Sequence, residues 1–403
     1  MGIEGDERKG VVEPGVLTRD FVLLFVASCF FIGSLYLVLP ILPLYMKDIA
    51  GATTTQVGLL IGALTVSSFL LRPYVGRKAD TFGMKPLLII GAADFIIASL
   101  LYIWSKSLLS LPFVLVFQGI GIACYHTTSL AFVGGAAPES RRGQSMAWFQ
   151  SSFNVGIMFA PFLGEYLMDR FGYTTVFVTA SISAAVSLLM ILTVREHKVP
   201  DVLGEAPIRR GVKDIRGLIV LVSIAVFAGT ATLGSLEAFL ALFAEAEGIG
   251  RFALFFTISA GFLLTLRLLA GSLPDRLGRR LTGTGALVTL AVSMVVLAFV
   301  KNFAGLCVAA VLWGAGFAFL SPSLSALLID HAPADELGSA FGIYTAAFEG
   351  GIAFGAIAMG PVVSWLGFRY AFLFIGCVSL IGAVFFASLF PRLAGKGGPP
   401  QHG

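Results

Sequence analysis

Gly76-Arg77-Lys78-Ala79-Asp80-Thr81-Phe82-Gly83-Met84-Lys85-Pro86 reads as a short charged turn between two long apolar runs. A related segment, Gly271 to Arg280, lies 195 positions later and aligns its Gly271, Asp275 and Gly278 with Gly76, Asp80 and Gly83. The same offset, without a gap, pairs Arg72 with Arg267, Gly119 with Gly314, Gly121 with Gly316 and Gly156 with Gly351. A constant register over about a hundred residues predicts a duplicated half-molecule.

The composition excludes an ordinary soluble domain. Apolar residues make up 57% and charged residues 12% of the 403 residues, whereas soluble domains are about 25% charged. A membrane-spanning helix needs about 20 apolar residues, and strands without closure would leave backbone polar groups bare in lipid. We therefore predict an all-α membrane protein with twelve transmembrane helices in two pseudo-symmetric six-helix bundles. The apolar runs cover residues 21–45, 55–74, 87–105, 109–134, 146–168, 174–193, 218–243, 252–270, 282–300, 303–328, 340–363 and 370–390.

The spacing of these runs divides the chain into five parts. We predict an N-terminal tail (1–20), a first bundle (21–193), a linker (194–217), a second bundle (218–390) and a C-terminal tail (391–403). The linker is basic, and we interpret it as a solvated connector in preference to a surface helix on anionic lipid. Its length lets the two halves move as separate bodies.

Lys and Arg are distributed unequally between the two sides of the membrane. With the N-terminus inside, 21 of the 27 basic residues fall on the inner side and 6 on the outer side. Cytoplasmic loops carry an excess of Lys and Arg. We therefore expect a multi-pass protein of the cell membrane, meaning the inner or plasma membrane, with both termini in the cytoplasm.

The two charged segments resemble the Gly-x-x-x-Asp-x-x-Gly-x-Lys/Arg loop between helices 2 and 3 of the major facilitator superfamily, and its echo between helices 8 and 9. The resemblance covers roughly residues 20 to 390. It implies a latch in which the Asp80 loop holds the two halves together on the cytoplasmic side. The alternative is topological charge alone, which we favour for Lys78, Lys85, Arg279 and Arg280. The expected latch residues are Gly76, Asp80, Gly83, Arg77, Arg72, Asp275, Arg267 and Gly271.

The fifth apolar run carries Gly156, Pro161 and Gly164, which resemble the helix-5 motif of the proton-coupled antiporters in this superfamily. Small residues at this spacing let helices pack closely, and proline kinks a helix. Two positions depart from the motif, because Ala160 and Glu165 stand where glycine is common. An antiporter arginine is also missing from helix 4, where Leu115 stands, and helix 1 has no charge between Phe21 and Tyr45. These departures weaken the case for the usual proton route.

Polar residues inside the apolar runs are the main clues to function. A charge at the centre of a membrane helix costs about 3 kcal/mol on insertion scales, so each needs a reason. Under the 195 offset Asp94, His126 and Asn154 align with Thr289, Ser321 and Glu349, so the scaffold glycines repeat and these residues do not. An asymmetric substrate requires such an asymmetric cavity. The candidate substrate- and proton-binding residues are Glu237, Glu349, His126, Asp94, Asn154, Gln118, Gln150 and Tyr125.

The resemblance also sorts these candidates by helix. In the superfamily, helices 4, 5, 7 and 11 surround the central cavity, which favours His126, Asn154, Glu237 and Glu349 as lining residues. Helix 3 is peripheral, so Asp94 is either a proton site or a hydrogen-bonded partner within the first half. His126 could carry protons, since histidine titrates at about pH 6.5, or it could be a satisfied buried histidine.

These features predict a secondary transporter that exports a small organic solute, such as a drug, sugar or metabolite, in exchange for protons. The sequence has no phosphate-cradling loop, catalytic triad or metal-ligand spacing, and its four cysteines are scattered. We therefore expect no enzyme activity, no cofactor, no metal and no nucleic acid, and a monomer whose partners are the solute, protons and the lipid bilayer. The alternatives are an importer or uniporter on the same fold, or a non-transporting membrane receptor.

Overall fold

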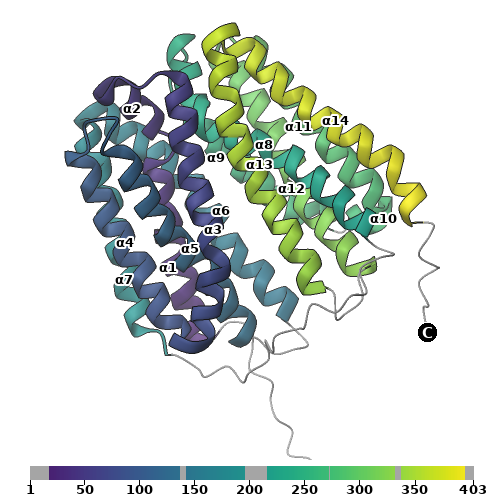
Figure 1. Ribbon diagram of the computed structural model, residues 1–403, viewed down its shortest axis with the longest axis horizontal. Coiled ribbons are helices and arrows are strands. Elements are labelled where there is room, and N and C mark those ends of the chain that lie inside the picture. Colours follow the sequence, from purple (N-terminus) through teal and green to yellow (C-terminus); the bar gives the residue numbers. More distant parts are fainter. Residues whose placement is uncertain (1–17, 137–141, 196–215, 272, 332–336, 395–403) are drawn as a thin grey trace, which may run out of the picture.

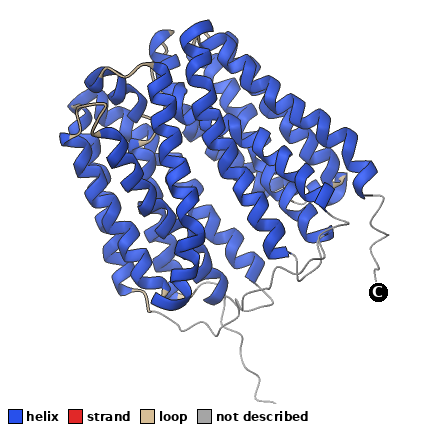
Figure 2. Ribbon diagram, in the orientation of Figure 1, coloured by secondary structure: helices blue, strands red, loops and turns tan. Residues whose placement is uncertain are grey.

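The computed structural model describes residues 18–136, 142–195, 216–271, 273–331 and 337–394. Over these residues the chain is helical and contains no strand (Figure 2). The helices are α1 (Arg19–Val38), α2 (Leu42–Ala50), α3 (Thr54–Phe82), α4 (Met84–Trp104), α5 (Leu111–Ala136), α6 (Arg142–Phe171), α7 (Tyr173–Thr193), α8 (Arg216–Ala246), α9 (Leu254–Ala270), α10 (Leu273–Leu277), α11 (Arg279–Phe299), α12 (Phe303–His331), α13 (Leu337–Leu366) and α14 (Phe368–Ala394).

The helices form two six-helix bundles, as predicted (Figure 1). Helices α1 to α7 make the first, in which α1 and α2 are one span interrupted at Pro40, because proline has no N–H to continue the helix. Helices α8 to α14 make the second, with the short α10 following α9. Between the bundles, α3 packs on α13 and α6 packs on α9. The linker and the two tails proposed from the sequence fall mostly outside the described residues.

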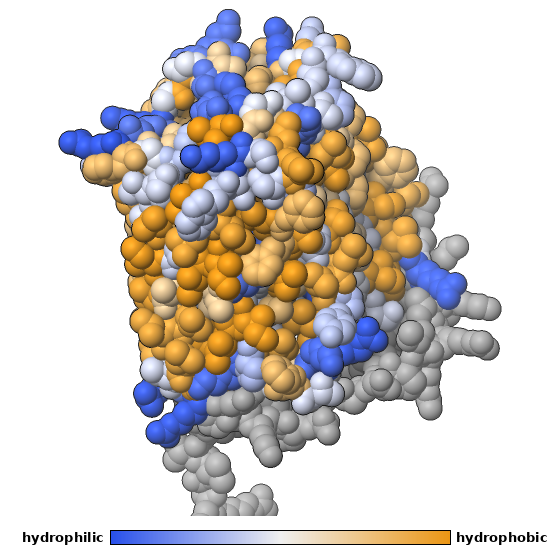
Figure 3. All heavy atoms as spheres, turned by 60° about the vertical axis from the view of Figure 1, so that its left-hand side comes forward, coloured by the Kyte–Doolittle hydropathy of each residue, from blue (hydrophilic) through white to orange (hydrophobic). Residues whose placement is uncertain are grey.

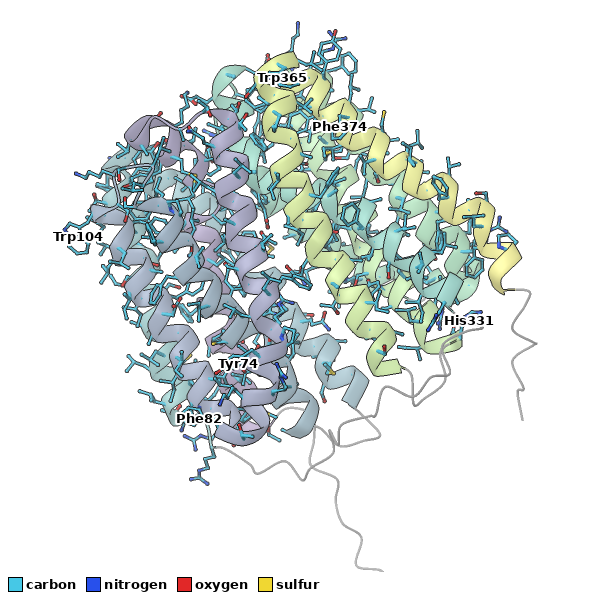
Figure 4. The ribbon with its side chains drawn as sticks, in the orientation of Figure 1. Tyr74, Phe82, Trp104, His331, Trp365 and Phe374 are labelled. Atoms are coloured by element: carbon cyan, nitrogen blue, oxygen red, sulfur yellow. The ribbon has the colours of Figure 1, made fainter. Side chains whose placement is uncertain are left out.

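The surface of the bundles fits a lipid bilayer. Among the described helices, ten are long and apolar enough to cross a membrane, and α9 is a shorter apolar helix of 17 residues. Figure 3 shows an apolar band on the visible face between two hydrophilic ends. Exposed aromatic side chains mark both ends, with Trp104 and Trp365 at one and Tyr74 and Phe82 at the other (Figure 4). Such residues are enriched at membrane interfaces.

We call the end that carries Arg19, Thr193, Arg216 and Ala394 the linker end, and the opposite end the distal end. The two bundles meet at the distal end and diverge toward the linker end (Figure 1). Helix α2, the start of α3 and the last turns of α13 lie at the distal end.

The internal repeat appears in the packing. Gly119 faces the carbonyl oxygen of Leu64, and its counterpart Gly314 faces that of Ser259, which is 195 residues after Leu64. Lys85 donates from Nζ to the carbonyl oxygens of Leu192 at 2.9 Å and Val194 at 2.7 Å. Its counterpart Arg280 donates from Nη2 to the carbonyl oxygen of Ala387 at 2.6 Å, again 195 residues on. These basic side chains, which we interpreted as topological charge alone, tie the ends of α7 and α14 to their bundles.

One prediction about the charged segment was wrong. Gly76 to Phe82 are not a turn but the last two turns of α3, and the chain reverses at Gly83. The positive φ of Gly83 (94°) is a conformation that glycine adopts without strain, and Gly278 repeats it with φ 85°. The sequence could not separate the turn from the helix, because charged residues are also usual in the last turns of a helix at a membrane surface.

Close packing of α8 on α13 gives a direct test of the fold. A Cβ added at Gly355 would lie 2.0 Å from the carbonyl oxygen of Ala231, whereas one added at Gly285 would meet nothing within 4 Å. We expect Gly355→Ala to destabilise the protein by about 1–3 kcal/mol, since overpacking forces the two helices apart. Thermal unfolding in detergent would measure this, with Gly285→Ala as the control. Equal unfolding temperatures for the two variants would contradict the α8–α13 contact.

Candidate transport site

An ion pair between the two bundles lies at the centre of the site. Arg72 of α3 places Nη2 2.6 Å from Oε1 of Glu349 on α13. The two side chains are only 16% and 11% exposed. Among the polar contacts that the structure describes between the bundles, this one lies farthest from the distal end. A buried charge without a partner is costly, so each bundle supplies the counter-charge that the other needs.

A second acid lies beside this pair. Glu237 of α8 is buried, and its Oε1 accepts a hydrogen bond of 2.7 Å from the hydroxyl of Tyr36 on α1. This contact also joins the two bundles. The charge of Glu349 acts on both Glu237 and Tyr36. The site thus holds two carboxylates and one guanidinium, so its charges do not cancel when both acids are ionised.

His126 of α5 completes the set on the side of the first bundle. It is half-buried and interacts electrostatically with Arg72. The centroid of its ring lies 5.0 Å from that of Phe153 on α6. We call Tyr36, Arg72, His126, Glu237 and Glu349 the central cluster. Five different helices contribute to it, so a relative movement of the bundles changes its contacts.

The structure places three of the predicted site residues elsewhere. Gln118, Tyr125 and Asp94 are buried inside the first bundle. Gln118 accepts from the hydroxyl of Tyr102 at 2.6 Å, and Tyr125 stacks on Phe31 with its hydroxyl 3.1 Å from that of Ser28. The carboxyl group of Asp94 lies against Gly121, where a Cβ would be 2.2 Å from Oδ2. Gln118 and Tyr125 make contacts that hold α1, α4 and α5 together. Oδ2 of Asp94 is buried without a hydrogen-bond partner among the described residues, so neither role predicted for Asp94 is tested.

Helix α6 carries the remaining candidates. Asn154 is half-buried and donates from Nδ2 to the carbonyl oxygen of Gln150 one turn earlier at 3.2 Å, and Gln150 itself is exposed. In the helix-5 motif, Gly156 and Gly164 face the backbone of α1 at Cys29 and Leu37. Pro161 lies within α6, which continues through it. The motif therefore packs α6 closely on α1.

The predicted latch is described only in part. The side chains of Asp80 and Asp275 lie outside the described residues, while Gly76 and Gly83 are half-buried and Arg77 and Gly271 are exposed. Arg267 donates from Nε to the carbonyl oxygen of Ala318 at 3.4 Å, within its own bundle. Arg72, expected as a partner in the latch, binds Glu349 of the other bundle with its guanidinium.

Sequence reasoning missed two residues that join the bundles. Helix 1 contains several aromatic residues, and nothing in the sequence separates Tyr36 from the others. Its hydrogen bond to Glu237 is seen only in the structure. Glu165 was noted as a departure from the helix-5 motif, yet its carboxylate accepts from the backbone N–H groups of Phe252 at 2.9 Å and Ala253 at 3.0 Å. Its position in place of a motif glycine was the signal that could have found it.

Known transporters share this architecture. The solved structure of a peptide transporter in complex with sulfate superposes with a TM-score of 0.80 at 14% identity and covers 94% of this chain and 96% of that one. The inward-open xylose transporter XylE from E. coli gives a TM-score of 0.73 at 16% identity, covering 91% of this chain and 95% of that one.

Two relatives in sequence are named as a resistance protein and a transporter. Multidrug resistance protein 2 of Bacillus subtilis is 26% identical over 360 residues, which cover 86% of this chain and 89% of the relative. The synaptic vesicular amine transporter of Mus musculus is 25% identical over 340 residues, covering 81% and 65%. The family description "Major Facilitator Superfamily" matches residues 24–273 and 250–402. The chain therefore belongs to the major facilitator superfamily of multi-pass membrane transporters.

Proposed function

We propose that this transporter exports a small organic solute in exchange for protons. The central cluster is the observation that carries the proposal. It places two carboxylates, Glu237 and Glu349, in the interior between the bundles, each bound to a residue of the opposite bundle. A cluster of this kind must be rebuilt whenever the bundles move apart.

Proton coupling follows from the chemistry of the ion pair. Glu349 can be neutralised by Arg72 or by a proton, but a carboxylate that has taken a proton no longer attracts the guanidinium. Protonation therefore weakens the link between α3 and α13, while deprotonation restores it. A ligand or proton can shift a conformational equilibrium only by binding the two states differently, and this pair supplies such a difference.

The charges favour a cationic or zwitterionic substrate. The cluster has two acids against one arginine, and the ring of Phe153 beside His126 adds an apolar surface. The partner of Glu237 is the hydroxyl of Tyr36, which carries no charge. An organic cation bound near Glu237 would supply the missing positive charge. Relatives named as multidrug resistance and amine transporters agree with this class of substrate.

The orientation predicted from Lys and Arg assigns the described state to one step of an export cycle. If the linker end faces the cytoplasm, the described state is closed toward the outside and diverges toward the inside. An exporter would load its solute in this state and release it after the bundles rock. We also propose that it works as a monomer in the cell membrane, without a bound cofactor.

A second candidate function is uptake or facilitated diffusion on the same fold. Two observations favour it: Leu115 stands where the antiporters have arginine, and helix 1 carries no acid between Phe21 and Tyr45. Reconstituted vesicles with an imposed pH gradient separate the two functions. Export by exchange requires that solute and protons move in opposite directions, whereas uptake with protons requires the same direction. If no solute moves although partners still bind, the protein is a receptor.

The first prediction concerns the coupled transport itself. Glu237→Gln and Glu349→Gln keep the size of the side chain but remove the titratable group, so we expect each to abolish pH-gradient-driven transport. Radiolabelled solute flux in proteoliposomes would measure this, with the exposed Glu247→Gln as the control. Full driven transport in both variants would refute the role of these acids.

The second prediction concerns the energy of the ion pair. Breaking a buried pair by removing one partner costs about 3–5 kcal/mol, because the other charge remains buried. We expect Arg72→Gln and Glu349→Gln each to lower the unfolding temperature, and the double variant to be more stable than the sum of the two predicts. A double-mutant cycle by thermal unfolding in detergent measures this coupling. Additive effects would show that the pair is absent in the protein.

A further inference from the structure

We propose that Glu165 is a lock that holds the distal end of the transporter closed. Its carboxylate lies on α6 of the first bundle and binds the N-terminus of α9 in the second. Oε1 accepts from the N–H of Phe252 at 2.9 Å, and Oε2 accepts from the N–H of Ala253 at 3.0 Å. Both oxygens are used, and the side chain is 6% exposed. The proposal rests on a movement between the bundles and not on the identity of the solute or the coupling ion.

The N-terminus of α9 depends on this contact. Its N-cap residue is Ala253, and no side chain within its own helix accepts from the first N–H groups. The first N–H groups within α9 donate to the carbonyl oxygens of the preceding residues, at distances of 3.0 to 3.2 Å. The N–H groups of Phe252 and Ala253, directly before the helix, donate instead to Glu165 of the other bundle. A carboxylate at this end of a helix also interacts favourably with the helix dipole. When the distal end opens, α6 and α9 must separate, and these buried N–H groups lose their partner.

The loop before α9 is shaped to present these groups. Arg251 has a φ of 60° and is the one residue other than glycine with a positive φ among the described residues. Such a conformation is uncommon for a side chain with a Cβ and persists only where the surroundings hold it. It turns the chain directly before Phe252 and Ala253, so that consecutive N–H groups point toward α6.

The internal repeat shows that the contact is specific to one side. The counterpart of Glu165 is Gly360 on α13, which approaches the start of α3 so closely that a Cβ would lie 2.9 Å from Cα of Thr55. Helix α3 caps itself, because Thr53 and Gln56 form a capping box. The distal end is thus closed on the α3–α13 side by close backbone contact and by Ser364, which hydrogen bonds to Thr54 and Thr55. On the α6–α9 side it is closed by a buried charge.

Other polar contacts at the distal end are weaker candidates for this role. Lys47 and Glu245 form an ion pair of 2.6 Å between the bundles, but their side chains are 49% and 43% exposed. Exposed ion pairs contribute little because water and salt screen them. Glu165 is buried and binds two backbone donors, so breaking its contact costs more than breaking the exposed ion pair.

The test measures the distance between the bundles at each end in full-length protein in lipid vesicles. Spin labels replace the exposed Lys106 and Lys301 at the distal end, and in a second sample Thr81 and Arg276 at the linker end, after the four native cysteines are removed. We expect Glu165→Gln to increase the ratio of distal-open to distal-closed molecules about tenfold, since glutamine accepts only one of the two N–H groups. The distance distribution of the spin-label pair at the distal end then gains a longer component. That of the pair at the linker end gains a shorter component.

Two further variants keep the test decisive. Glu247→Gln removes an exposed acid near the same end and should leave both distances unchanged. Ala253→Ser, added to Glu165→Gln, supplies a capping hydroxyl for N–H groups inside α9, which Glu165 does not bind, and does not restore the contact between the bundles. If Glu165 holds the distal end closed, this double variant should keep the raised ratio of distal-open molecules. Unchanged distances in Glu165→Gln, or full reversal by Ala253→Ser, would overturn the proposal. Neither readout needs a solute or a pH gradient, so a failure of the proposed export would leave this result unaffected.

Discussion

The free-energy cost of burying charge between the two bundles determines how the bundles can be arranged. Removing an ion from water is expensive, and attraction to a partner repays the cost only when the geometry is good. Arg72 and Glu349 meet that condition at 2.6 Å, but only while α3 and α13 remain side by side. If only apolar contacts joined α3 and α13, one helix could shift along the other and make similar contacts in its new position. This pair instead links the arrangement of the bundles to the charge state of one carboxyl group.

The chain combines a symmetric scaffold with asymmetric chemistry. Contacts made by glycine and by the basic clamps Lys85 and Arg280 recur at an offset of 195 residues, so both halves fold by the same rules. The acids that join the halves do not recur, because Glu165 corresponds to Gly360 and Glu349 corresponds to Asn154, although Arg72 has a counterpart in Arg267. Duplication thus accounts for the two bodies, and the differences between them lie in the acids at their interface.

The fold could be predicted from the sequence because it depends on properties that a sequence displays directly. Apolar length, the 195-residue register and the glycine pairs are all local or periodic, and the structure agrees with them. The interface could be predicted only in part. Glu237 and Glu349 stood out because an acid in an apolar run is unusual, whereas Arg72 was counted with the loop charges near Gly76. Its partner is 277 residues away in the chain, and nothing local to α3 distinguishes a basic residue that turns inward from one that reaches the membrane surface. Tyr36 was missed for the same reason.

The contact between α3 and α13 also determines how these helices can move. Gly58 and Gly360 bring backbone against backbone, at Ala356 and Thr55, and the side chain of Ile357 lies against Gly62. Small residues at a helix contact leave few side chains to withdraw when the helices separate. The α3–α13 seam can therefore part and close again at the distal end with little rearrangement of side chains.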